Sequence, residues 1–134
     1  MDEARLTSIP LFAGLSRKGR RVVAQRADEV ELDSGRHIVR QGEWSYEFFA
    51  IMDGTAEVRR GDQFLAELGP GDFFGEMGLL EDTRRNASVI ARSPITVVVM
   101  TAQAFRQTAR EDPEVAGHIR KAVEERSRHL EAVN

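Results

Sequence analysis

Between residues 27 and 101 the chain consists of short apolar runs separated by turns that contain glycine or polar residues. The runs are rich in β-branched and aromatic residues. They recur roughly every 7 to 12 residues, a spacing typical of an all-β sandwich or barrel. The run over 55–59 partly alternates between apolar and polar residues, as a half-buried strand does. The pattern predicts strands over 29–32, 37–40, 47–52, 55–59, 64–67, 87–91 and 96–100.

Three turn sequences mark points where the predicted strands reverse. Asp53-Gly54 and Gly61-Asp62 have the composition of hairpin turns. The string Gly69-Pro70-Gly71-Asp72 is typical of a turn that reverses the chain. We therefore expect the strands to pair mainly with antiparallel neighbours.

Helical signals precede and follow this region. Pro10 permits only a short helical turn after it, and Gly14 is able to end that turn. Ser16 is the expected N-cap of a short helix that ends at residue 25 or 26.

The C-terminal part predicts two further helices. Thr101 is the expected N-cap of a short helix over 102–110. Asp112 caps a second helix, in which Pro113 takes the first position, where its missing N–H is tolerated. This helix runs to the terminus with an apolar stripe that Arg126 interrupts; the stripe consists of Ile119, Ala122, Val123, Leu130 and Val133.

These elements predict a mainly β fold with flanking helices. We expect short helices over 1–26, an antiparallel jelly-roll-like β-barrel over 27–101, and helices over 102–134 that end in a long C-terminal one. A length of 134 residues suits a single domain over 1–134. The chain starts with methionine and ends directly after the long helix, so we expect a stand-alone protein.

Composition narrows the function classes. With 41 % apolar and 31 % charged residues, no signal-peptide core and no apolar run of about 18–20 residues, we expect a cytoplasmic protein without a membrane partner. The absence of cysteine excludes disulfides, thiolate nucleophiles and cysteine-ligated metals. A net charge of −3 argues against a nucleic-acid partner.

The segment over 73–89 carries the candidate chemistry. Gly75 and Gly78 allow a ligand to approach the backbone closely, and residues 76–80 suit one short helical turn whose free N–H groups favour an anion. Arg85 follows a few residues later and can pair bidentately with a phosphate, while Glu76 can accept hydrogen bonds from sugar hydroxyls. The pattern fits a ligand with one phosphate and one hydroxyl. The alternative is a loop without a ligand, because a Gly-x-x-Gly spacing is common and two arginines in a loop are usually solvated.

The strings over 74–80 and 85–89 resemble the phosphate-binding cassette of cyclic nucleotide-binding domains. Such domains occur in catabolite activator protein, in regulatory subunits of cyclic AMP-dependent kinase and in cyclic nucleotide-gated channels. The string over 69–76 is highly specific for this family, and similar motifs at 11–15, 40–43 and 52–58 extend the resemblance over nearly the whole chain.

The resemblance implies a set of ligand-binding residues. Glu76 would bind the ribose 2′-hydroxyl and Arg85 would neutralise the cyclic phosphate, whereas Arg84 stands where many members have proline and receives no ligand contact. The cassette residues implied at the site are Phe74, Gly75, Glu76, Met77, Gly78, Arg85, Asn86, Ala87 and Ser88. Asn86 stands where the family varies between cyclic AMP and cyclic GMP sites, so it is the candidate for base selection.

Two aromatic residues and one arginine have alternative interpretations. Trp44 and Tyr46 either stack on a base or anchor their loop on the core, and we favour the core. Arg126 either reaches the base, as an arginine does at a similar place in the gated channels, or lies exposed at the edge of the stripe. The C-terminal helix either packs on the barrel or a second copy, giving a homodimer, or forms a lid over the base; both roles are compatible.

The predicted function is that of a regulatory module. We expect reversible binding of a 3′,5′-cyclic nucleotide, cyclic AMP rather than cyclic GMP, with signalling to an unknown effector protein through the C-terminal helix. No catalytic residue, metal site or cofactor is expected, because His37, His118 and His129 lie far apart and no nucleophile motif is present. We expect His37 in a strand and the other two histidines on helix surfaces. The alternatives are a ligand-free dimerisation barrel and the sensor half of a larger transcription factor or channel.

Overall fold

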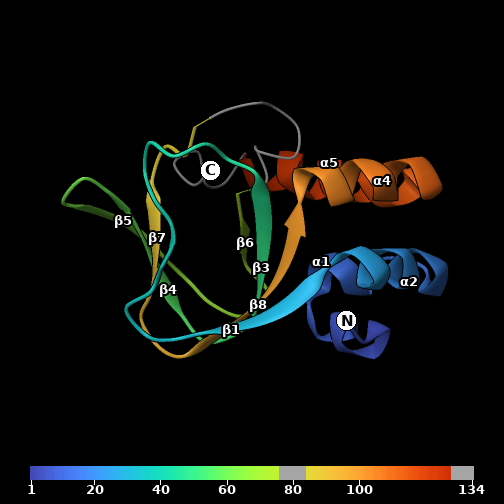
Figure 1. Cartoon of the computed structure of the whole chain (residues 1–134), viewed down its shortest axis with the longest axis horizontal. Helices are drawn as coiled ribbons and strands as arrows, with labels where there is room; N and C mark the ends of the chain where they lie inside the picture. The colour runs from blue at the N-terminus through green and yellow to red at the C-terminus, as the bar shows by residue number, and fades with distance from the viewer. Residues whose placement is uncertain (76–83, 128–134) are drawn as a thin grey trace.

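The computed structural model describes residues 1–75 and 84–127, and Figure 1 shows their arrangement. The N-terminal segment forms a 3-10 helix, η1 (Glu3–Ser8), followed by α1 (Pro10–Ala13) and α2 (Arg17–Arg26). Eight strands follow, and the C-terminal part forms α4 (Ala102–Glu111) and α5 (Pro113–Ser127). The strands are β1 (Asp28–Leu32), β2 (His37–Val39), β3 (Glu47–Asp53), β4 (Ala56–Arg60), β5 (Gln63–Leu68), β6 (Phe73–Phe74), β7 (Ser88–Ala91) and β8 (Ile95–Thr101).

The strands form two antiparallel four-stranded sheets, ordered β1-β8-β3-β6 and β2-β7-β4-β5. Eight strands in two facing sheets are the arrangement of a jelly roll. The pairing found among the described residues does not join the sheets into a closed barrel. The mainly β fold with flanking helices is therefore confirmed, as two facing sheets rather than a continuous cylinder.

All seven predicted strands are present, with ends within two residues of the expected ones. The additional strand, β6, has only two residues, Phe73 and Phe74, which pair with Ala50 and Phe49 of β3. Two residues show no alternation, so periodicity could not find this strand. The 3-10 helix η1 was also absent from the prediction.

The predicted helix caps are confirmed. The Ser16 hydroxyl accepts from the Gly19 N–H at 3.0 Å, and the Thr101 hydroxyl accepts from the Ala104 N–H at 3.0 Å. The Asp112 carboxylate accepts from the Glu114 N–H at 3.2 Å, directly after Pro113. The stripe residues Leu130 and Val133 lie outside the described residues.

The sheet β1-β8-β3-β6 separates two apolar cores. In Figure 1 the helices stand beside β3 and β8 on one side, and β4, β5 and β7 lie on the other. Phe48 and Met100 belong to the core on the helical side, whereas Ile51 and Val97 belong to the core between the sheets. Because β3 and β8 are buried on both faces, their sequences are almost continuously apolar.

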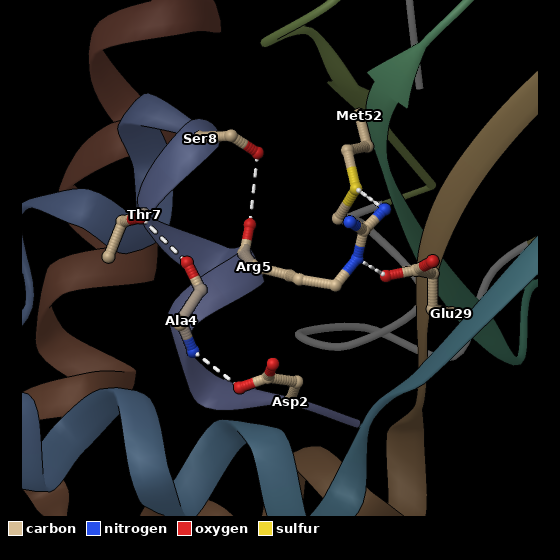
Figure 2. Close-up of polar contacts among 7 residues, drawn as sticks. All are labelled: Asp2, Ala4, Arg5, Thr7, Ser8, Glu29 and Met52. Carbon is tan, nitrogen blue, oxygen red and sulfur yellow. Dashed lines mark hydrogen bonds and ion pairs between the residues drawn. The ribbon is translucent and has the colours of Figure 1, made fainter.

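Polar contacts fasten the N-terminal helices to the sheet. Figure 2 shows that Arg5 of η1 reaches across to Glu29 of β1, with its Nε 2.5 Å from the Glu29 carboxylate, and to the Met52 sulfur of β3 at 3.2 Å. The carboxylate of Glu29 raises the pKa of the Arg5 guanidinium. The contact therefore ties the first helical segment to two strands of the sheet.

His118 corrects one expectation. We expected a residue on the helix surface, but its ring is half-buried and its Nε2 lies 2.7 Å from the Leu11 carbonyl of α1. A Cβ on Gly14 would lie 2.9 Å from this ring. A glycine at the end of α1 thus makes room for the histidine that joins α1 to α5. His37 is a strand residue as expected, and His129 lies outside the described residues.

Candidate anion-binding site

The two ends of the predicted cassette belong to different sheets. Phe74 ends β6 in one sheet, and Ser88 begins β7 in the other. The chain therefore changes sheets between Phe74 and Ser88, and we call this step the crossing. Three predicted site residues, Glu76, Met77 and Gly78, fall outside the described residues.

Arg85 is a buried cation at the end of this crossing. Arg85 is only 4 % exposed, and its Nη2 donates to the Glu47 carbonyl at 2.7 Å. The guanidinium lies 6.0 Å from the ring centre of Phe49, which stacks on Phe74 with ring centres 5.0 Å apart. A permanent positive charge in such apolar surroundings favours an anion at the site.

Gly75 makes room for this guanidinium. Its φ of +79° lies in the left-handed region, which glycine adopts without a steric penalty. Gly75 is buried, and a Cβ at this position would lie 2.3 Å from Arg85 Nη1. Sequence reasoning selected Gly75 for close approach by a ligand, and the structure shows a close approach by Arg85 itself.

The backbone of Arg85 is fixed by the turn that precedes β3. The Arg85 N–H donates to the Glu43 carbonyl at 2.7 Å, and the Gly42 N–H donates to the Arg85 carbonyl at 2.9 Å. Trp44 and Arg84 form an antiparallel bridge next to these bonds. We call residues 42–47 the clamp segment, because three of its residues bond to Arg85: Gly42 and Glu43 to its backbone, and Glu47 to its side chain.

The residues after Arg85 are held mainly by the fold. The exposed Asn86 offers its carbonyl to Arg60 Nε at 3.1 Å, and the buried Ala87 belongs to the core between the sheets. The Ser88 hydroxyl accepts from the Gln41 N–H at 2.9 Å. The structure thus brings Phe74, Gly75 and residues 85–88 together around one crossing.

The favoured interpretation of Trp44 and Tyr46 was wrong. Neither ring anchors the loop on the core, because Trp44 is 45 % exposed and Tyr46 is 62 % exposed. The residue between them, Ser45, is the buried one, since alternate side chains of an extended segment face opposite sides. The buried Ser45 hydroxyl has no hydrogen-bond partner among the described residues, so it is available to a water or a ligand.

Arg126 joins helix α5 to the residue at the start of the cassette. It is half-buried, donates from Nη1 to the Phe73 carbonyl, and lies 4.6 Å from the centre of the Phe73 ring. The interpretation of Arg126 as an exposed edge residue was therefore wrong. Arg126 lies on the last described turn of α5, and its guanidinium contacts Phe73, the residue that precedes Phe74.

Several supporting residues escaped sequence reasoning. Glu43 and Glu47 act through backbone carbonyls, which leave no signature in side-chain identity. Phe49 reads as an ordinary core residue of a strand. Gly42 is the exception, because a glycine in a sequence can mark a turn with positive φ, and Gly42 has a φ of +88°.

Two features are absent from the described residues. No group of three or more histidine, cysteine, aspartate or glutamate side chains among them is placed to hold a metal ion. Among the same residues, no helix is both long and apolar enough to cross a membrane.

Comparison with known proteins agrees with this geometry. Residues 29–112, more than half of the chain, match the model of the family described as "Cyclic nucleotide-binding domain". The chain is 36 % identical over 112 residues to a cAMP-dependent protein kinase regulatory subunit of Mycosarcoma maydis, covering 77 % of this chain and 21 % of that protein. The chain therefore spans about a fifth of this relative's length.

Two solved structures have a similar fold. The N-terminal domain of a transcriptional regulator from Streptomyces coelicolor A3(2) matches with a TM-score of 0.77 and 24 % identity, over 92 % of this chain and 90 % of that one. The regulatory domain of Toxoplasma gondii PKA, in a co-crystal structure with cAMP, matches with a TM-score of 0.75 and 25 % identity, over 91 % and 48 %. From the family match, which covers β1 to the end of α4, we conclude that this chain belongs to the cyclic nucleotide-binding domain family.

Proposed function

We propose that the chain is a regulatory module that reversibly binds a 3′,5′-cyclic nucleotide, with cyclic AMP preferred to cyclic GMP, and that it performs no catalysis. The observation that carries the proposal is the buried Arg85 guanidinium at the crossing between the two sheets. A cyclic phosphate carries one negative charge and presents two free oxygens. It suits a single guanidinium, which pairs with phosphate oxygens through short, charge-assisted hydrogen bonds.

The remaining cassette residues complete the proposed site. Glu76 accepts a hydrogen bond from the ribose 2′-hydroxyl, and the N–H groups near Gly78 and Ala87 add to the phosphate shell. These roles follow from the family motif at those positions. Met77 and Ser88 lie next to these contacts, and Asn86 faces the base.

The output of the module is proposed to be the position of α5. Arg126 links the last described turn of α5 to Phe73, the residue directly before the cassette string over 74–80. A ligand that contacts the cassette differently in two states shifts the equilibrium between two positions of this helix. In the nucleotide-bound state, Arg126 is proposed to contact the base, and the helix docks on the site. The chain is also proposed to form a homodimer through α5. An effector protein is proposed to respond to the position of this helix.

A calorimetric titration tests the binding function. Cyclic AMP, cyclic GMP and the non-cyclic 5′-AMP are titrated separately into the purified protein at constant salt. The proposal requires one nucleotide per chain, the highest affinity for cyclic AMP, and much weaker binding of 5′-AMP, whose phosphate is larger in charge and free to rotate. No heat with either cyclic nucleotide, at concentrations that saturate a kinase regulatory subunit, contradicts it.

A further inference from the structure

The clamp segment holds Arg85 at three points. Two are the backbone hydrogen bonds from Arg85 to Glu43 and from Gly42 to Arg85, at 2.7 and 2.9 Å. The third is the bond from Arg85 Nη2 to the Glu47 carbonyl, at 2.7 Å. The direction of the Arg85 side chain therefore depends on how residues 42–47 lie against residues 84–85.

One side chain of the clamp segment contacts the opposite strand directly. The guanidinium carbon of Arg84 lies 4.4 Å from the centre of the Trp44 ring, and Arg84 Nη1 donates to the Gly42 carbonyl at 2.9 Å. Trp44 and Arg84 are also the paired residues of the antiparallel bridge. The stacked pair thus sits at the register point next to both backbone bonds of Arg85.

The exposure of Trp44 needs an explanation other than core packing. At 45 % exposure the ring contributes little to either apolar core, and it belongs to neither. A tryptophan face is the strongest aromatic partner for a guanidinium. The ring fits best as the surface on which Arg84 is held in place.

We propose that Trp44 is a positioning residue for Arg85: by stacking on Arg84 it sets the register of the clamp segment and thereby aims the Arg85 guanidinium at the anion. The inference rests on the proposed function, since it describes how the phosphate arginine is held. Trp44 touches Arg84 and acts on the ligand only through Arg85. This distinguishes it from a residue that stacks on the base.

A double-mutant cycle tests this route of action. Trp44→Ala is made in the wild type and in Arg85→Ala, and affinity for cyclic AMP is measured by calorimetry. A half-exposed cation–π contact predicts a roughly two- to fivefold loss of affinity in the wild-type background. In the Arg85→Ala background the same change has no further effect, because coupled residues are non-additive.

Matched variants separate positioning from a general effect on stability. Trp44→Phe keeps an aromatic face and restores most of the affinity, whereas Tyr46→Ala removes a more exposed ring of the same segment and leaves the affinity unchanged. Melting temperatures of all variants are compared, and Trp44→Ala is expected to melt close to the wild type. Trp44 is the only tryptophan of the chain, so its emission should also change when cyclic AMP is added to the wild type.

Each outcome decides between the interpretations. The positioning role is overturned if Trp44→Ala lowers the affinity for cyclic AMP equally in the wild type and in Arg85→Ala. It is also overturned if Trp44→Ala binds cyclic AMP with wild-type affinity. Neither result contradicts nucleotide binding itself. If the wild type binds no cyclic nucleotide, the proposed function fails and this inference fails with it. A loss that disappears in the Arg85→Ala background and is rescued by Trp44→Phe supports the inference.

Discussion

Gly75 and Arg85 pack so closely against each other that a methyl group on Gly75 would not fit between them. A Cβ on Gly75 would lie 2.3 Å from Arg85 Nη1 and 2.6 Å from the Glu47 carbonyl oxygen. Contacts below 3.0 Å force a shift, and one of these partners is backbone. The close packing of Arg85 thus requires a glycine at this position of the cassette.

We predict that Gly75→Ala both destabilises the domain and weakens cyclic AMP binding. The left-handed φ of +79° and the displaced guanidinium together cost about 1–3 kcal/mol of unfolding free energy. Gly35→Ala is the matched control, because Gly35 has a φ of +89° and no atom within 4 Å of a built Cβ. Denaturant unfolding and calorimetry of both variants measure the difference. An equal effect of the two changes would mean that only backbone strain matters.

Arg85→Ala should be the most damaging single change to binding. Removing one partner of a buried charge pair costs about 2–5 kcal/mol, so affinity falls by well over tenfold while the fold survives. Glu76→Ala should cost less, about 1–3 kcal/mol, for lost hydroxyl contacts. Arg84→Ala serves as the comparison, because Arg84 is exposed and contacts Trp44 and Gly42. If Arg84→Ala proves worse than Arg85→Ala, Arg85 is not the phosphate residue.

Asn86→Thr should shift the preference toward cyclic GMP. Asn86 is exposed and directly follows Arg85 in the chain, and its backbone carbonyl accepts a hydrogen bond from Arg60. A threonine hydroxyl at this place can meet the guanine amino group of a base held in the syn conformation. The ratio of dissociation constants for the two nucleotides is the measurement, and an unchanged ratio removes Asn86 from base selection.

Cyclic AMP should protect α5 from hydrogen exchange. Arg126 joins α5 to Phe73, so ordering of the cassette is expected to stabilise the end of the helix. We predict slower exchange over 120–132 as well as 74–89 when cyclic AMP is bound. Arg126→Ala should remove the protection over 120–132 and keep that over 74–89. Protection confined to the cassette in the wild type would make α5 a static packing element.

Glu57 should make stability depend on pH in the acid range. Hydrogen bonds from Arg92 and Arg59 lower the pKa of the Glu57 carboxyl below its ordinary value of 4.5. A lowered folded-state pKa contributes stability that is present above 4.5 and is lost as pH falls through the folded value. Melting temperatures of wild type and Glu57→Gln should therefore differ at neutral pH and converge in acid. A difference that persists unchanged below the folded pKa would contradict this sign.

Much of the fold could be predicted because its signals are local. Serine, threonine and aspartate caps at 16, 101 and 112 fixed three helix starts, and turn sequences at 53–54, 61–62 and 69–72 fixed the strand ends. β6 could not be predicted, because Phe73 and Phe74 form a strand only through pairing with β3.

Only part of the arrangement at the candidate site could be predicted from the sequence. The cassette string selected Arg85 and Gly75, but the way they pack depends on the backbone carbonyl of Glu47 and on the path of the clamp segment. Trp44 was expected in the core because an aromatic loop residue usually anchors there. Its actual partner, Arg84, is distant in sequence and leaves no periodic signal.

The most direct measurement is a crystal structure of the protein with cyclic AMP. We predict that at least one of the two exocyclic phosphate oxygens lies about 2.7–2.9 Å from a guanidinium nitrogen of Arg85, the range of charge-assisted pairs. The Arg85 backbone bonds to Gly42 and Glu43 should remain in place. A nucleotide whose phosphate lies elsewhere would contradict the proposed role of Arg85 in binding the phosphate. So would crystals grown at saturating cyclic AMP that contain no nucleotide at the crossing between β6 and β7.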